Sequence, residues 1–231
     1  SSTNDLKEII EENLEELFRV YDERFRSTYG PMHPRVRDLM EAYLRCGDPH
    51  FGFLRVRCCN PSCDSKTERI VPFSCKSRGL CCSCSQKRAL LWAERMAREV
   101  LPDVPYVQLV FTIPRMLRKS FLWDRTLYGD LCRSAYAATS RFFQAQFPGL
   151  EKAVPGVVAA PQSFGNILNF HPHAHALSSL GVFTRDGVFH PVPEDIDFAP
   201  LEELFREELF KALLKKEQIT EERITLLRSW K

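Results

Sequence analysis

The sequence predicts an α+β protein in which a small cysteine-rich module lies between N-terminal helices and an antiparallel sheet with flanking helices. Three observations support this class: helical periodicity near the N-terminus, a cysteine cluster from Cys58 to Cys84, and mixed strand and helix patterns beyond it. Strands and helices that do not alternate regularly are typical of α+β architecture. We predict a helical region over 1–45, a cysteine-rich module with a basic helix over 46–101, and a sheet domain over 102–231.

The N-terminal region has the pattern of two helices. Apolar residues recur every three or four positions up to Phe25, with Glu and Arg between them, which predicts an amphipathic helix. Gly30 and Pro31 end this helix. A second helix is predicted over 34–44, because proline is favoured in the first turn of a helix.

Short strands and longer helices are predicted in the rest of the chain. The β-branched and aromatic residues of 106–113 form the clearest strand pattern, and Pro114 ends it. Asp186 and Gly187 indicate a hairpin turn. The other predicted strands cover 51–56, 69–73, 156–164 and 173–180, and the other predicted helices cover 86–101, 123–147 and 200–216.

Composition and charge narrow the class of protein. There is no run of eighteen apolar residues, and the first twenty residues are acidic. We therefore expect neither a membrane span nor a secretory signal, and we expect a cytoplasmic protein. The net charge is only +2, but from Arg55 to Arg98 ten Lys and Arg stand against three Asp and Glu, a formal +7. Such a segment attracts polyanions such as nucleic acids; a solvated basic surface is the alternative.

The nine cysteines indicate metal binding, because disulfides do not persist in a reducing cytoplasm. Cys81 and Cys84 have the spacing of a metal knuckle, and upstream either Cys58 or Cys59 can pair with Cys63. Two such pairs about twenty residues apart can close a four-thiolate zinc site. Zinc would supply the folding free energy that this loop-rich stretch lacks.

Four further cysteines have simpler interpretations. Cys75 is a surplus thiol that could also be a ligand, and Cys82 is a spare cysteine between two ligands. Cys46 and Cys132 lie on amphipathic stretches and are interpreted as small apolar packing residues.

A second candidate metal site lies in the sheet domain. His173 and His175 occupy alternate positions of a predicted strand, so their side chains share one face. His171 precedes a proline and is expected outside the strand. Because two imidazoles alone hold a hard divalent ion poorly, an oxygen ligand is needed. Gln162, on the preceding predicted strand, could supply it; the alternative is a surface glutamine.

Several short segments occur in an order that resembles a known family. Together they resemble the zinc-binding rolling-circle transposases of bacterial insertion sequences, which belong to the HUH endonuclease superfamily. The segments are Cys46-Gly47 with Gly52-Phe53-Leu54-Arg55-Val56-Arg57-Cys58, Val71-Pro72-Phe73-Ser74-Cys75-Lys76, Cys81 with Cys84, Gln162 with Phe164-Gly165 and Leu168-Asn169, and His173-Ala174-His175.

The resemblance implies two metals and a DNA partner. A zinc-ribbon-like module would hold structural zinc, and the antiparallel sheet would hold Mg or Mn for nicking single-stranded or hairpin DNA in the bacterial nucleoid. In HUH enzymes a tyrosine attacks the metal-polarised phosphate, which leaves a 5′-phosphotyrosine and a free 3′-hydroxyl for later rejoining. The implied zinc ligands are Cys58, Cys63, Cys81 and Cys84, and the implied Mg or Mn ligands are His173, His175 and Gln162.

The nucleophile is the main departure from the family pattern. The family's tyrosines follow the histidines, but the last tyrosine here is Tyr136. Tyr128 and Tyr136 are interpreted as packing residues. We therefore expect a HUH-like nuclease domain over 102–231 that is C-terminally truncated, in a transposase by lineage that does not cleave by the family route. The alternatives are a noncatalytic zinc-dependent DNA-binding protein derived from a transposase, and a zinc-stabilised protein without a nucleic-acid role.

Overall fold

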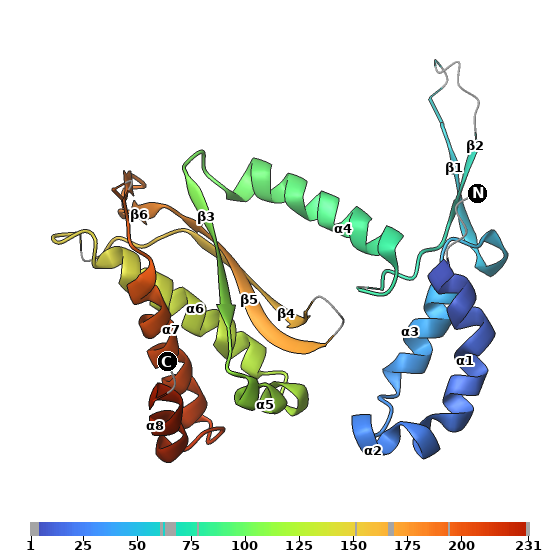
Figure 1. The fold of residues 1–231 in the computed structure, drawn as a ribbon. Helices are drawn as coiled ribbons and strands as arrows, with labels where there is room; N and C mark the ends of the chain where they lie inside the picture. Colours follow the sequence, from blue (N-terminus) through green and yellow to red (C-terminus); the bar gives the residue numbers. More distant parts are fainter. Residues whose placement is uncertain are drawn as a thin grey trace. The chain divides into compact units, whose positions relative to one another are not determined.

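The computed structural model describes residues 5–60, 62, 68–77, 79–150, 152–165, 169–193 and 195–229. The α+β prediction is confirmed: helices are combined with antiparallel strands in two compact units, Ser1–Pro102 and Asp103–Lys231 (Figure 1). None of the described helices is long and apolar enough to cross a membrane.

The first unit combines three helices with a hairpin and a basic helix. The amphipathic helix α1 and helix α3 contribute Ile10, Leu14 and Tyr43 to a small core that also contains Cys81. The N-terminal helices therefore share a unit with the cysteine module rather than forming a separate body. The elements are α1 (Asp5–Arg24), α2 (Arg26–Tyr29), α3 (Arg35–Leu44), η1 (Pro49–Phe51), β1 (Phe53–Arg57), β2 (Glu68–Pro72), α4 (Cys82–Arg95) and the π-helical turn η2 (Met96–Val100).

The hairpin of β1 and β2 has no core of its own. The strands pair antiparallel from Phe53 opposite Pro72 to Arg57 opposite Glu68, and none of their residues is buried. A two-stranded hairpin is only marginally stable in water. Its base must therefore be held by other contacts, and the cysteines next to it provide them.

The second unit is a three-stranded antiparallel sheet with helices on one face. The strand order is β3-β5-β4, so β5 is central, and α6 and α7 pack closely together below the sheet (Figure 1). The elements are β3 (Tyr106–Thr112), η3 (Arg115–Leu117), α5 (Arg118–Trp123), α6 (Leu127–Gln144), β4 (Val157–Phe164), β5 (Phe170–Ser179), β6 (Gly181–Phe183), β7 (Phe189–Pro191), α7 (Ala199–Lys215) and α8 (Glu221–Ser229).

Alternation along β5 separates a helix-facing side from an open side. Ala174 and Ala176 are buried in the core shared with α6 and α7, and small residues let the helices approach the sheet closely. Phe111, opposite Ala174 on β3, packs its ring 4.8 Å from that of Phe205 on α7. Because side chains alternate between faces, His173 and His175 point to the other side.

The start of β5 differs from the sequence expectation. The strand begins at Phe170, so His171 and Pro172 lie within it and not before it. A proline is normally confined to edges or bulges. Here β3 ends at Thr112 opposite His173, so Pro172 has only β4 beside it, at the point where that ladder is irregular between Gln162 and Phe164. Its missing N–H therefore costs no regular ladder bond.

An ionic contact joins α6 to the end of α7. Asp130 is only 8% exposed. Its Oδ1 lies 2.6 Å from a guanidinium nitrogen of Arg133, and its Oδ2 lies 2.6 Å from Nζ of Lys216. Burial raises the pKa of Asp130, but the hydrogen bonds and charges of Lys216 and Arg133 outweigh it and hold this pKa below the ordinary carboxyl range.

We predict that this contact stabilises the second unit at neutral pH and that the stabilisation is lost as the pH falls below the ordinary carboxyl range. A depressed pKa in the folded state contributes stability above the unfolded carboxyl pKa, and this stability is lost as pH falls through the folded value. Asp130→Asn should lower the free energy of unfolding by about 1–2 kcal/mol at pH 7 and by less at pH 3. Urea unfolding measures both values, with the exposed Asp195→Asn as control; an equal loss at both pH values would contradict the prediction.

Candidate metal centres

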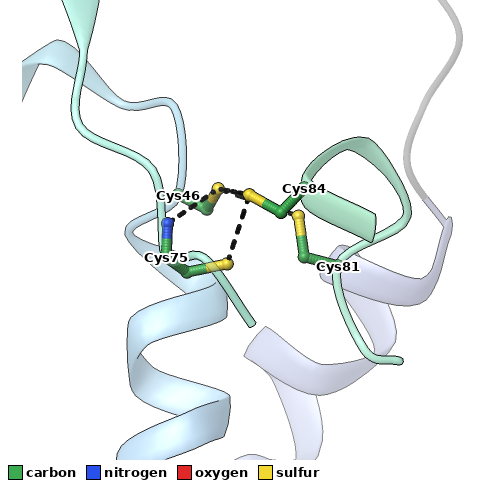
Figure 2. A group of neighbouring side chains, drawn as sticks. All are labelled: Cys46, Cys75, Cys81 and Cys84. Carbon is green, nitrogen blue, oxygen red and sulfur yellow. Dashed lines mark hydrogen bonds between the residues drawn. The ribbon is translucent and has the colours of Figure 1, made fainter. Parts of the chain in front are cut away.

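Four cysteines from three separate segments meet in the first unit. Cys46 follows α3, Cys75 follows β2, and Cys81 and Cys84 lie at the start of α4. Figure 2 shows the four sulfur atoms turned toward one another. All four sulfurs lie within 4.8 Å of one another.

The geometry of this group fits a four-thiolate zinc site. Zinc–sulfur bonds of about 2.3 Å put neighbouring sulfurs of a tetrahedral site about 3.8 Å apart. The Sγ atoms of Cys46 and Cys84 are 3.6 Å apart, those of Cys46 and Cys81 3.7 Å, and those of Cys75 and Cys84 3.7 Å. The sulfurs are thus spaced almost as a bound zinc ion would require.

Two backbone N–H groups donate hydrogen bonds to cysteine sulfurs, which favours the thiolate form of those cysteines. The N–H of Cys75 donates to the sulfur of Cys46 (3.3 Å), and the N–H of Ser77 donates to the sulfur of Cys75 (3.4 Å). Lys76 adopts a left-handed φ of 53°, and this turn directs the N–H of Ser77 back toward the sulfur of Cys75. Burial raises the pKa of Cys75, but the hydrogen bonds from Ser77 and the neighbouring thiols lower it to about 7. Burial is the main cause that raises the pKa of Cys46 to about 12, and it outweighs the lowering by the hydrogen bond from the Cys75 N–H.

The two upstream cysteines of the group differ from those that the sequence analysis predicted. Cys81 and Cys84 lie together, but with Cys46 and Cys75 rather than with Cys58. Cys58 follows the far end of β1, whereas Gly47 and Phe73 at the near end hold the base of the hairpin. Five strand residues of about 3.3 Å each separate the two ends, so Cys58 and Cys59 cannot reach this group. Cys63 lies outside the described residues.

The two histidines of β5 converge on one point. Their Nε2 atoms are 3.1 Å apart and their ring centroids 4.9 Å. His173 is only 7% exposed, and its Nδ1 lies 2.7 Å from the carbonyl oxygen of His171. A hydrogen bond from Nδ1–H to this carbonyl leaves the Nε2 lone pair free to bind a metal.

The neighbouring strands contribute polar side chains to the same face. Gln108 on β3 places its amide nitrogen 3.3 Å from Nδ1 of His175, which fixes the orientation of that ring. Gln162 on β4 lies directly opposite His173 in the ladder, so both share one face. Among the described residues, no carboxylate forms a three-ligand group with the histidines. An amide oxygen is therefore the available oxygen ligand.

Comparison with known proteins finds two transposase family models that match parts of the chain. A transposase zinc-binding domain matches residues 17–113, and a second family model, described as "Putative transposase", matches residues 156–229. The first match covers all four clustered cysteines, and the second covers Gln162 and both histidines of the strand pair. The chain is thus similar to zinc-binding transposases of the IS91 type over two separate parts of its sequence.

Two curated proteins are similar to this chain. It is 32% identical over 146 residues to the transposase for insertion sequence element IS801 of Pseudomonas savastanoi pv. phaseolicola, which covers 63% of this chain and 33% of that protein. It is 29% identical over 173 residues to "Putative transposase y4qJ" of Sinorhizobium fredii, which covers 74% and 42%. The chain thus spans between a third and a half of these relatives.

Three residues of the candidate sites were not assigned from the sequence. Cys46 was interpreted as a packing residue and Cys75 as a surplus thiol, because neither has a cysteine two or three positions away. Cys46 precedes and Cys75 follows the two predicted strands of the hairpin, and both lie in segments that carry the family resemblance, which was the available signal. Gln108 was overlooked, although it is a polar residue in an otherwise apolar strand.

The two candidate tyrosines lie away from the histidine face. Tyr128 on α6 packs edge-to-face on Phe121 at 5.6 Å, and burial raises its pKa. It belongs to the core on the helix side of the sheet. Tyr136 is on the same helix, so neither is placed to attack a phosphate beside His173.

Proposed function

We propose that this chain is the part of a transposase that binds single-stranded DNA and holds one Mg or Mn ion at His173 and His175 for phosphodiester nicking and rejoining. The observation that carries the proposal is the convergence of two Nε2 atoms, 3.1 Å apart, on the open face of a central strand. Such an arrangement suits a divalent ion that acts as a Lewis acid on a phosphate. DNA of this kind would place the protein at the bacterial nucleoid.

Each residue of the site has a separate task in this proposal. His173 and His175 bind the ion through Nε2, while the His171 carbonyl and Gln108 keep the rings oriented. Gln162 offers its amide oxygen as the third ligand. The metal, when bound, polarises the scissile phosphate and neutralises charge as it develops.

The zinc site has a structural task. Cys46, Cys75, Cys81 and Cys84 would hold zinc and so fix the base of the β1–β2 hairpin against the start of α4. The basic segment Arg55 to Arg98 is thereby presented to DNA; its exposed cations include Arg55, Arg57, Arg69, Lys87 and Arg88. Such cations give sequence-independent affinity for phosphates.

The covalent step needs a nucleophile from outside these 231 residues. None of the six tyrosines follows His175 in the sequence, and Tyr128 lies on the helix side of the sheet. A tyrosine hydroxyl would form a bond to phosphorus, the 3′-oxygen would leave as a hydroxyl, and the hydroxyl proton would pass to solvent or a base. We assign metal holding and strand binding to this chain, and not the attack itself.

Manganese binding tests the proposal directly. We expect the zinc-loaded chain to bind one Mn ion whose electron-spin-echo spectrum shows imidazole nitrogen, and to bind oligothymidylate with an affinity that falls as salt rises. A spectrum without imidazole nitrogen, or DNA binding that is independent of salt, would overturn the proposal.

A noncatalytic DNA-binding protein is the second candidate function. The position of the tyrosines favours it, since the chain offers none near the histidines. Manganese binding separates the two candidates, because only the first requires an ion at His173 and His175. DNA binding without any Mn ion on imidazole would support the binding-only function, whereas an ion held by both histidines would contradict it.

A further inference from the structure

A chain of hydrogen bonds crosses the open face of the sheet at the histidine pair. The amide nitrogen of Gln108 lies 3.3 Å from Nδ1 of His175. Nε2 of His175 lies 3.1 Å from Nε2 of His173, and Nδ1 of His173 lies 2.7 Å from the carbonyl oxygen of His171. These contacts share rings, so the proton on one ring nitrogen decides which group donates at the next contact.

The carbonyl oxygen of His171 sets the direction of donation. A carbonyl only accepts hydrogen bonds, so Nδ1 of His173 carries the proton and Nε2 of that neutral ring has a lone pair. Two bare lone pairs would repel each other at 3.1 Å, so Nε2 of His175 carries the proton between the rings. Nδ1 of His175 is then an acceptor, which matches the amide N–H of Gln108 beside it. The two neutral histidines are therefore opposite tautomers.

This tautomer of His175 opposes metal binding. An ion held by both histidines needs a lone pair on each Nε2, but here Nε2 of His175 carries a proton. For a neutral His175 to bind the ion, that proton must be on Nδ1 instead. Nδ1–H and the amide N–H of Gln108 would then be two donors 3.3 Å apart. The amide must therefore turn its oxygen toward the ring.

We infer that Gln108 is the positioning residue that sets the tautomer of His175 and thereby the affinity of the histidine pair for a divalent ion. Its amide nitrogen donates to Nδ1 in the metal-free site, and its amide oxygen accepts from Nδ1–H when an ion is bound. A half-turn of the amide group exchanges the two roles. This assignment rests on the proposed function, because that function places the ion on His173 and His175.

The surroundings of Gln108 leave its amide free to turn. Gln108 is exposed, so packing does not lock its side chain. Among the described residues, only Gln108 forms a hydrogen bond with Nδ1 of His175. Gln108 on β3 and Val158 on β4 both lie opposite Leu177 on β5, so they occupy mirror positions next to His175 on the open face. Val158 has no polar group with which to take over this task.

Nitrogen NMR of the metal-free histidine site tests the tautomers. In the zinc-loaded chain with isotope-labelled histidine, and without Mg or Mn, we expect a proton on Nδ1 of His173 and on Nε2 of His175. Gln108→Glu should place a proton on Nδ1 of His175, because a carboxylate only accepts hydrogen bonds. The single variants His173→Ala and His175→Ala assign the signals. A change of tautomer is not expected from a merely structural role of Gln108.

Manganese titration tests the consequence for metal binding. Gln108→Glu should bind Mn about tenfold more tightly than the wild type and Gln108→Leu about tenfold more weakly, as is usual for residues that orient a metal ligand. The new carboxylate would contact the ring nitrogen that faces away from the ion, so it would not be a ligand itself. The matched control is Val158→Glu, which adds the same charge at the mirror position and should strengthen binding less than about threefold.

Two results would overturn the assignment of Gln108. One is a proton on Nδ1 of His175 in the metal-free wild type, and the other is equal Mn affinity in Gln108→Glu and Val158→Glu. If the wild type binds Mn through imidazole in either case, the proposed function still stands. If Gln108→Glu changes the tautomer but no variant binds Mn through imidazole, the proposed function is wrong, and so is the metal-binding part of the assignment.

Discussion

Cys46→Ser is expected to abolish tight zinc binding and to unfold the first unit. Structural zinc contributes on the order of 10 kcal/mol to the folding of small zinc modules, and the hairpin of β1 and β2 has no buried residues with which to compensate. Removal of one of four thiolates should weaken zinc binding more than about a hundredfold. Zinc release to a chromophoric indicator and the loss of the corresponding circular-dichroism transition measure both effects.

Cys58→Ser is the matched control for this experiment. Cys58 is exposed beyond the end of β1, so its replacement should leave zinc stoichiometry and melting temperature unchanged. The two variants together distinguish the site observed in the structure from the ligand set implied by the family resemblance. Loss of zinc in Cys58→Ser and retention in Cys46→Ser would show that the metal is held elsewhere.

His175→Ala is expected to reduce manganese affinity more than about a hundredfold and to remove the imidazole signal that it contributes. The physical reason is that one of two converging imidazoles is lost, and His171, whose ring centroid lies 5.1 Å from that of His173, forms no three-ligand group with them. Manganese titration followed by electron paramagnetic resonance measures the affinity. Gln162→Ala should produce a smaller loss, because its neutral amide is a weaker ligand.

His33→Ala controls for a general loss of histidine. His33 is exposed in the first unit, and its replacement should leave Mn binding unchanged. Wild-type affinity in His175→Ala would contradict the assignment of the metal to β5. A normal melting temperature is expected in both variants, because His175 packs on the open face of the sheet and not in the core.

Most elements of the fold could be predicted because their patterns are local. The apolar stripe of α1, the proline at the start of α3 and the β-branched run of β3 are each set by residues within one turn or strand. The start of β5 could not be predicted in this way. Pro172 breaks the local strand pattern, and only the end of β3 and the irregular ladder with β4 show why it is tolerated.

The candidate sites divide according to how far apart their residues lie in the chain. Cys81 with Cys84 and His173 with His175 are close in sequence, and helix or strand geometry alone brings each pair together. Cys46 is 29 residues from Cys75, and Gln108 is 67 residues from His175. No local pattern specifies such contacts.

The sequence by itself determined the α+β class, the two short metal-binding pairs and the resemblance to zinc-binding transposases. The tertiary structure alone decided which cysteines complete the first site, that β5 is the central strand, and that Gln108 lies beside His175. The physical reason is range: periodicity and spacing act over a few residues, whereas ligand sets and grooves form where distant segments pack, and only packing in three dimensions brings them together.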